Sequence, residues 1–246
     1  MVSADEVYHG TVSILDKIRE TQFSRITAVA EKFAESIEKG GVIHIFGTGH
    51  SKAFAMEMSN RAGGLVPMHM MSIDDLLRRG DLQLNDMKDP SIERTPQIAN
   101  QLLDIYEIQS EDAALIISNS GRNGALVEMA RLFKQKGMFV AGVTSMSHST
   151  QVTSRHPSGK RLFEMVDLVI DNYGPLGDAF LSDPRLDAKV CSVSSISGAF
   201  IAQCLTAEIT RALLQRNQTV SVLMSANLDG ADERNEALVA RYKGRI

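Results

Sequence analysis

Residues 42–51 read Val42-Ile-His-Ile-Phe-Gly-Thr-Gly-His-Ser51, and this stretch gives the strongest indication of the fold. A short apolar run passes directly into glycines and hydroxyl side chains, and a helical pattern then continues to Arg61. A continuous apolar strand followed by a glycine-rich loop and a helix is typical of buried parallel sheets. The stretch therefore predicts one strand, one loop and one helix of an α/β protein.

The same pattern occurs a second time further along the chain. Residues 113–118 form another apolar run, residues 119–124 (Asn-Ser-Gly-Arg-Asn-Gly) form a polar loop, and residues 125–136 form an amphipathic helix. A long helix is predicted at 190–215. More strands are predicted at 65–71, 139–144, 166–171 and 220–224. Strands that alternate with helices predict a doubly wound, flavodoxin-like sheet of about five parallel strands flanked by helices.

The first 38 residues have apolar side chains at helical spacing, and Gly40-Gly41 ends the pattern. A break near Thr21 is compatible with the pattern, which would give two helices. We therefore expect an N-terminal helical extension over residues 1–40 and one main domain over residues 41–246.

Composition and charge exclude several classes of protein. The chain has 246 residues and a net charge of −4, which disfavours nucleic acid and anionic membranes as partners. It shows no secretory signal and no apolar run of membrane-spanning length, and its two cysteines form no disulfide framework or metal motif, so we expect a cytoplasmic protein. The histidines have no metal-ligand spacing, and no Rossmann or P-loop fingerprint is present, so we expect neither a metal nor a cofactor.

Both polar loops have the chemistry of an anion site. Backbone N–H groups at the start of a helix are free, and the helix dipole is positive there, which suits a phosphate group. Either loop alone is also explained as an ordinary connection between a strand and a helix. Two such loops in matching contexts favour a common crevice at the carboxyl ends of neighbouring strands.

The two loops resemble the signature loops of SIS (sugar isomerase) domains. The resemblance rests on Gly47–Ser51 and Ser118–Gly124 and covers about residues 40 to 220, while residues 154–160 and 225–230 resemble a small family of stand-alone bacterial SIS proteins related to phosphoheptose isomerase. It implies a sugar phosphate as ligand and a homodimer or higher oligomer with shared crevices. It also implies phosphate contacts from Ser51, Ser118 and Ser120, with Gly47, Gly49, Gly121 and Asn123 shaping the loops. Asn123 stands where the family usually has threonine.

Isomerisation of a sugar phosphate needs a base that moves a proton between adjacent carbons. Glu57, on the helix after the first loop, is the first candidate, and an ion pair with Arg61 at i, i+4 is the alternative. His50 in the first loop is a second candidate. His156 is a candidate acid that reaches a neighbouring subunit, or else part of an exposed loop.

We expect a phosphosugar isomerase that uses no cofactor. Two alternatives stay open: a module that senses a sugar phosphate without turnover, and a lyase or amino-sugar-processing enzyme on the same scaffold.

Overall fold

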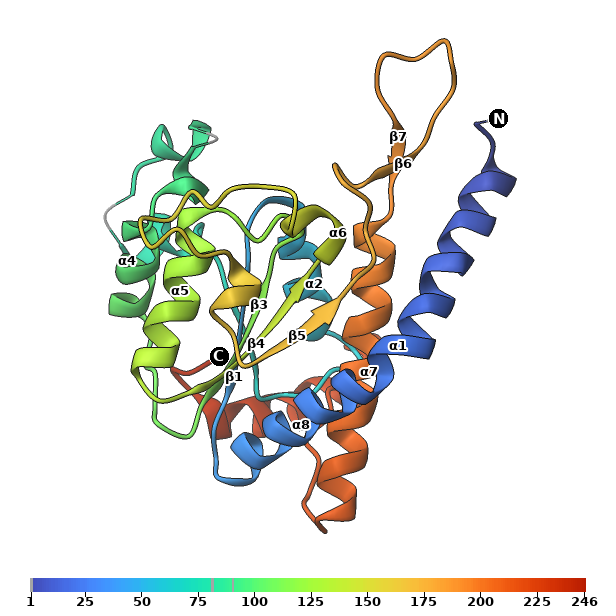
Figure 1. The fold of residues 1–246 in the computed structure, drawn as a ribbon. Coiled ribbons are helices and arrows are strands. Elements are labelled where there is room, and N and C mark those ends of the chain that lie inside the picture. The colour runs from blue at the N-terminus through green and yellow to red at the C-terminus, as the bar shows by residue number, and fades with distance from the viewer. Residues whose placement is uncertain (1, 81, 90) are drawn as a thin grey trace.

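A computed structural model describes residues 2–80, 82–89 and 91–246. Its centre is a sheet of five parallel strands in the order β2-β1-β3-β4-β5 (Figure 1). The strands are β1 (Ile43–Gly47), β2 (Met68–Met71), β3 (Ala113–Ile117), β4 (Phe139–Thr144) and β5 (Leu168–Asp171). The predicted fold class, with a parallel sheet of five strands and a helical N-terminus, is confirmed.

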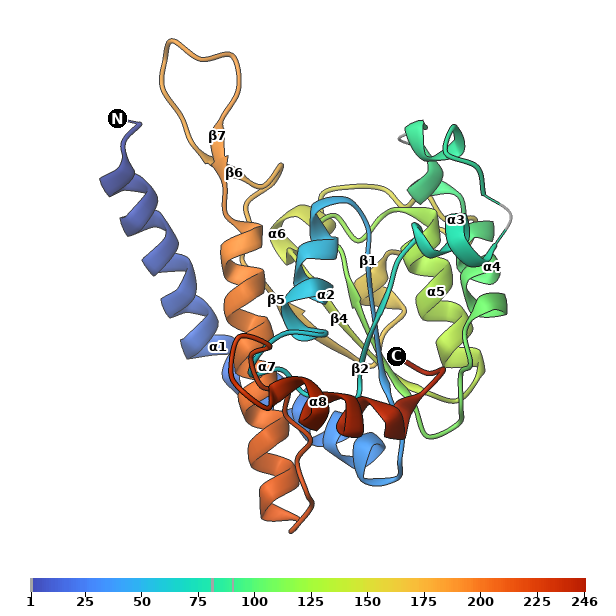
Figure 2. The same cartoon turned by 180° about the vertical axis from the view of Figure 1, so that it is seen from behind.

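Helices cover both faces of the sheet. One face is covered by α1 (Ala4–Glu38), α2 (Lys52–Met58) and α7 (Ser194–Gln215), and the other by α3 (Asp75–Arg79), α4 (Gln97–Ile105) and α5 (Gly124–Gln135) (Figures 1 and 2). Each face has its own apolar core, with Phe33 in the first and Phe133 in the second. Since helices cover both sides of the sheet, its strands are mainly apolar, as the sequence indicated.

Helix α1 runs without interruption through Thr21, so the break that the sequence allowed is absent. It changes direction near its middle (Figure 1). The Thr21 hydroxyl donates to the carbonyl of Lys17 at 2.7 Å, a bond back along the helix that tends to bend it. Ile26 and Phe33 in the second half are fully buried, so this part of the helix belongs to the core of the main domain.

The C-terminal third differs from the prediction in two places. Residues 190–192 form β7 (Val190–Ser192), which pairs with β6 (Ala179–Leu181) in an antiparallel hairpin, so the long helix begins only at Ser194. The strand predicted at 220–224 is wrong: only an isolated bridge joins Val222 to Leu65. Both errors have one cause, since short apolar runs do not distinguish a helix, a strand and a covered loop.

The remaining elements are short. They are η1 (Gly49–Ser51), η2 (Asp86–Lys88), η3 (Ile92–Arg94), α6 (Met146–Ser149), η4 (Leu162–Glu164), α8 (Ala231–Val239) and η5 (Ala240–Tyr242). Within the described ranges, every helix is too short or too polar to cross a membrane.

Candidate functional site

The two glycine-rich loops leave neighbouring strands. Strand β1 pairs directly with β3, and Gly47 lies opposite Ile117 at their carboxyl ends. The chain then turns to one face of the sheet in α2 and to the opposite face in α5 (Figure 2). This is the switch in strand order at which ligands bind in open α/β sheets, so the structure brings the predicted loops together at one edge.

The first loop requires its glycines. A Cβ atom on Gly47 would lie 2.7 Å from the carbonyl oxygen of Ser51, and Gly49 has a left-handed φ of 54°. His50 is exposed and Ser51 is half-buried, and the Ser51 side chain makes no capping bond at the start of α2. The loop thus turns tightly and leaves the Ser51 hydroxyl available at its rim.

Two hydrogen bonds to Ser118 fix the shape of the second loop. The Gly121 amide donates to Ser118 Oγ at 3.1 Å, and the Thr144 hydroxyl donates to the Ser118 carbonyl at 2.6 Å. Ser118 accepts the Gly121 bond and keeps its own proton to donate. Ser120, between these two residues, is half-buried. The predicted phosphate contacts therefore lie on a pre-formed turn at the start of α5.

Asn123 joins the second loop to a carboxylate that the sequence did not reveal. Its amide nitrogen donates to Glu93 Oε1 at 2.8 Å, and its amide oxygen accepts from Arg155 Nη1 at 2.9 Å. Glu93 lies in η3, and its Oε2 lies 3.8 Å from where a Cβ atom on Gly49 would be. A side chain of the second loop therefore holds a carboxylate against the first loop.

Arginines gather on the outer side of the second loop. Burial, followed by the nearby Arg122 and Arg94, lowers the pKa of Arg155, while Glu93 opposes this shift. Such mutual repulsion shows that these guanidinium groups lie close together. Arg122 Nε is buried and has no hydrogen-bond partner among the described residues. The cluster forms a positive field beside a loop that was predicted to bind phosphate.

A cavity of about 300 Å³ opens beside the first loop. Its walls contain Gly47, Thr48, Gly49, Lys52, Ser72, Ile73, Asp74, Met87, Asp89, Ile92 and Glu93. Lys52 pairs with Asp74, and this hydrogen bond lowers the pKa of Asp74. The other two carboxylates, on Asp89 and Glu93, are acceptors that suit sugar hydroxyl groups.

His50 lines a separate narrow cleft on the opposite side of the first loop. The cleft contains Ser51, Asn119 of the second loop and Ser194 at the start of α7. His50 therefore lies next to residues of both loops, but it does not line the cavity that contains Glu93.

Glu57 is held by neighbouring helices. Its carboxylate forms the i, i+4 ion pair with Arg61, and Gln203 of α7 donates to Oε1 at 2.6 Å. The alternative considered for Glu57 is thus present, and Glu57 lines neither space beside the first loop.

His156 is buried rather than part of an exposed loop. Its Nε2 lies 2.8 Å from Glu128 Oε2, and its Nδ1 lies 2.8 Å from Ser158 Oγ. A hydrogen bond from Arg131, opposed by burial and assisted by His156, lowers the pKa of Glu128 to about 2. Both ring nitrogens are engaged, so within one chain His156 fastens the loop at 154–160 onto α5.

Sequence reasoning missed the roles of Glu93 and Arg155. Glu93 lies in a polar stretch with no periodicity, and its approach to Gly49 depends on the tertiary fold. Arg155 lies in the segment 154–160 that resembles the family, but its contact with Asn123 spans 32 positions of the chain. Asn123 was itself a local signal, because its amide carries a donor and an acceptor on separate atoms, whereas the threonine usual in the family carries both on one hydroxyl. In the described part of the chain, no three His, Cys, Asp or Glu side chains gather as a metal ion would require.

Residues 8–145 match the SIS domain family. The chain belongs to the SIS domain family. It is 37% identical over 233 residues to a UPF0309 protein of Halalkalibacterium halodurans, covering 95% of this chain and 92% of the relative. It is 36% identical to a UPF0309 protein of Listeria innocua, covering 96% and 94% of the two chains.

Solved structures agree on the fold. A phosphoheptose isomerase from Francisella tularensis superimposes with a TM-score of 0.55 at 15% identity, covering 86% of this SIS protein and all of that chain (100%). Phosphoheptose isomerase from Neisseria gonorrhoeae gives 0.55 at 13% identity, covering 83% and 95%. At this identity the likeness shows the shared fold, and the chemistry has to be argued from the residues of the site.

Proposed function

We propose that this SIS protein binds a phosphorylated monosaccharide between its two loops and isomerises it by moving a proton between adjacent carbons. The observation that carries the proposal is that the loops end neighbouring strands and hold one carboxylate, Glu93, between them. Family membership and the phosphoheptose isomerase fold support the same ligand class.

The groups beside the two loops suit two different parts of the ligand. Phosphate suits the amides and hydroxyls of Ser51, Ser118 and Ser120 together with the arginines near the second loop, because each of these groups can donate to an oxyanion. The carboxylates of the 300 Å³ cavity accept hydrogen bonds from sugar hydroxyls. A bound sugar phosphate would therefore lie with its phosphate at the second loop and its carbon chain along the first.

Glu93 is our proposed base. It takes a proton from the carbon next to the carbonyl and returns it to the former carbonyl carbon, while a second proton moves between the two oxygens. No atom is gained or lost, so the reaction needs no cofactor. Glu57 is kept as the competing base, because an ion-paired carboxylate on α2 can still reorient. His50 lines the separate cleft beside Ser51, so in this pose it takes no part in the proton transfer.

Deuterium exchange tests the proposal. The protein is incubated in D₂O with aldose and ketose phosphates of five to seven carbons, and NMR follows exchange at C1 and C2. We expect exchange in at least one sugar, its loss in Glu93→Gln and its persistence in Glu57→Gln. Persistence in Glu93→Gln with loss in Glu57→Gln would assign the base to Glu57. Binding of a sugar phosphate without exchange would favour the alternative function, a module that senses a sugar phosphate without turnover.

We also propose a homodimer formed by the projecting half of α1. This half, the start of α7 and the β6–β7 hairpin extend beyond the sheet (Figure 1). Tyr8, Phe23 and Ile196 are exposed on these segments at 63%, 42% and 43%. Large apolar side chains that recur along exposed helices indicate a protein interface, and a second copy presents the same surface.

A further inference from the structure

Away from the loops, a network of buried, hydrogen-bonded polar side chains runs across neighbouring strands of the sheet. Asp112 is buried and accepts hydrogen bonds from His44 Nε2 at 2.9 Å, Gln109 N at 2.7 Å and Val42 N at 2.8 Å, and it pairs with Arg245. Burial opposes ionisation, but the His44 bond and the two amide bonds outweigh it and lower the pKa of Asp112 to about 2. The hydrogen-bonded network therefore begins at a buried carboxylate that stays ionised.

The carboxylate fixes the orientation of both histidines. It can only accept, so His44 Nε2 donates to it. His69 Nδ1 lies 2.9 Å from His44 Nδ1, and the two ring nitrogens share one hydrogen bond. Burial, followed by His44, lowers the pKa of His69 to about 3, so the His69 ring is neutral and its Nε2 is left for a further partner.

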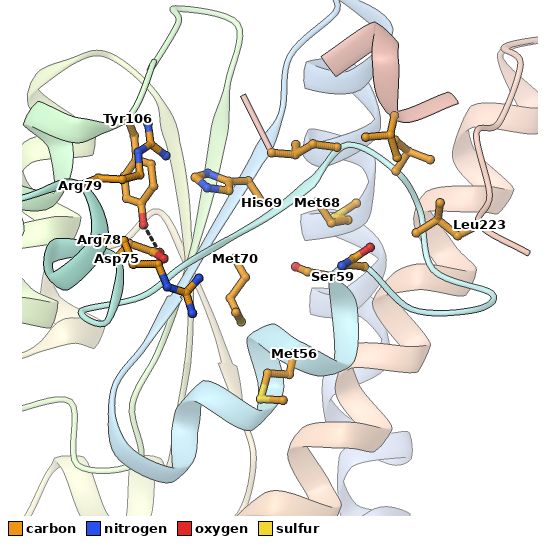
Figure 3. Close-up of a pocket in the computed structure, with 14 residues that line it drawn as sticks. Met56, Ser59, Met68, His69, Met70, Asp75, Arg78, Arg79, Tyr106 and Leu223 are labelled. Atoms are coloured by element: carbon orange, nitrogen blue, oxygen red, sulfur yellow. Dashed lines mark hydrogen bonds between the residues drawn. The ribbon is translucent and has the colours of Figure 1, made fainter. Parts of the chain in front are cut away.

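His69 opens onto a cavity of about 680 Å³ that lies along the outer side of strand β2. Figure 3 shows its imidazole between Tyr106 and the methionines of the strand. His69 is only 8% exposed, and Nε2 has no hydrogen-bond partner among residues 2–80, 82–89 and 91–246. A ring nitrogen that lines a cavity and has no partner in the protein can form a hydrogen bond with a ligand.

The polar wall of this cavity contains two guanidinium groups, on Arg78 and Arg79. The one carboxylate among the lining side chains is that of Asp75, which accepts from the Tyr106 hydroxyl. Arg79 is engaged with the Ile105 carbonyl at 2.6 Å and lies over the Tyr106 ring. Arg78 reaches into the space toward Met70 (Figure 3), and no carboxylate of the described residues pairs with it. Arg78 is therefore the cation available to an incoming anion.

The remaining wall is apolar and flexible. It is formed mainly by Met56, Met68, Met70, Leu223 and Val239. Unbranched, polarisable methionines adapt to flat or irregular ligands. The volume lies in the range of small-molecule sites, and the walls combine apolar side chains with a few polar groups, as such sites usually do. This cavity shares no residue with the walls described for the cavity at the loops.

We propose that this cavity is a second ligand site, which binds a small organic anion with an apolar body and a hydroxyl group. The oxyanion, a carboxylate or a phosphate ester, pairs with Arg78. The hydroxyl group, which can donate or accept, bonds to His69 Nε2, and the apolar body packs against the methionines. The buried hydrogen bonds that lead from Asp112 through His44 hold the His69 ring in position for this contact.

The test uses 4-hydroxybenzoate and 4-hydroxyphenyl phosphate as probes, which differ in the source of the anion. Binding is followed by the ¹⁵N resonances of His69 and the methyl resonances of Met56, Met68 and Met70. We expect at least one probe to shift both sets at millimolar concentration, and Arg78→Gln to weaken that binding about tenfold or more, as the loss of a charge-assisted bond implies. Benzoate lacks the hydroxyl group and should shift His69 Nε2 less than 4-hydroxybenzoate does.

Two controls separate this site from the loops. Arg78 is exposed on a short helix, so Arg78→Gln should fold normally, whereas His69→Gln is checked first for an intact methyl spectrum. Ser120→Ala should leave probe binding unchanged, and Arg78→Gln should leave sugar phosphate binding unchanged. Absence of shifts with both probes, or shifts that persist in Arg78→Gln, would overturn the proposal without affecting the proposed function of the loops.

Discussion

The side-chain amide of Asn123 donates to Glu93 Oε1 at 2.8 Å, and this contact connects the two loops of the SIS domain. It gives the departure from threonine at position 123 a physical role, since the asparagine amide donates to Glu93 from its nitrogen and accepts from Arg155 at its oxygen.

Asn123→Ala should reduce deuterium exchange more than sugar phosphate binding. Glu93 and Arg155 both lose a fixed partner, so the carboxylate is free to move from the first loop. Unfolding in urea should show a loss of about 1–3 kcal/mol from the unpaired partners. Asn123→Asp keeps the size but places a second carboxylate against Glu93, and exchange should fall further. Normal exchange in both variants would remove Glu93 from the proposed mechanism.

Glu93→Gln should lower the rate of exchange by about 100-fold or more, as expected for the loss of a general base. Glutamine keeps the size and can still bond to Asn123, so folding should be unaffected. Glu57→Gln is the matched control, because it removes a charge from a helix that borders the same loop. Equal rates in Glu93→Gln and the parent protein would contradict the assignment.

Gly121→Ala should destabilise the second loop more than an equivalent change elsewhere. Gly121 has a φ of 58°, and an added Cβ would lie 2.7 Å from Ser149 Oγ. Gly137 has a φ of 78° with open space around it, so Gly137→Ala carries only the backbone cost of about 1–2 kcal/mol. Steric overlap should make Gly121→Ala worse by about 1–3 kcal/mol. Chemical denaturation of the two variants measures the difference, and equal costs would show that the loop relaxes.

Stability should fall as the pH decreases from about 6.5 to about 3. Folding lowers the pKa of His69 to about 3, so in this window the unfolded chain binds a proton that the folded chain resists. The free energy of unfolding should therefore fall by up to about 1.4 kcal/mol per pH unit from this group. His69→Gln should flatten the dependence between pH 6 and 4. Retention of the full slope in the variant would show that another group is responsible.

Substitutions that disrupt the proposed dimer should change the mass of the particle in solution and leave the fold unchanged. Tyr8→Glu with Phe23→Glu should convert a dimer into a monomer in light scattering, because charges at an apolar interface are strongly disfavoured. Leu214→Glu, exposed by 59% near the other end of α7, should leave the mass unchanged. A parent protein that is itself monomeric would contradict the interface.

The sequence was informative where local pattern determines structure. The strand at Ile43–Gly47 and the helix at Gly124–Gln135 follow from apolar periodicity and from glycines that only fit a tight turn. The hairpin at residues 179–192 was missed because its strands are only three residues long and partly exposed.

Side-chain partners were harder to predict than backbone elements. Glu93 and Asn123 are 30 positions apart, and His44 and Asp112 are 68 apart, so only the folded sheet brings each pair together. His156 was recognised as a candidate from the sequence, but its partners in the fold decide what it can do. A sequence gives the donors and acceptors, whereas the tertiary fold decides which remain free for a ligand.

The central claim is that a sugar phosphate binds between the loops at Gly47–Ser51 and Ser118–Gly124. Isothermal titration of the protein with sugar phosphates of five to seven carbons, each beside its unphosphorylated sugar, tests this most directly when repeated on Ser120→Ala. The account predicts that at least one sugar phosphate binds, that its unphosphorylated sugar does not, and that Ser120→Ala weakens binding about tenfold. Equal binding of a sugar and its phosphate, or equal affinity in Ser120→Ala, would contradict it.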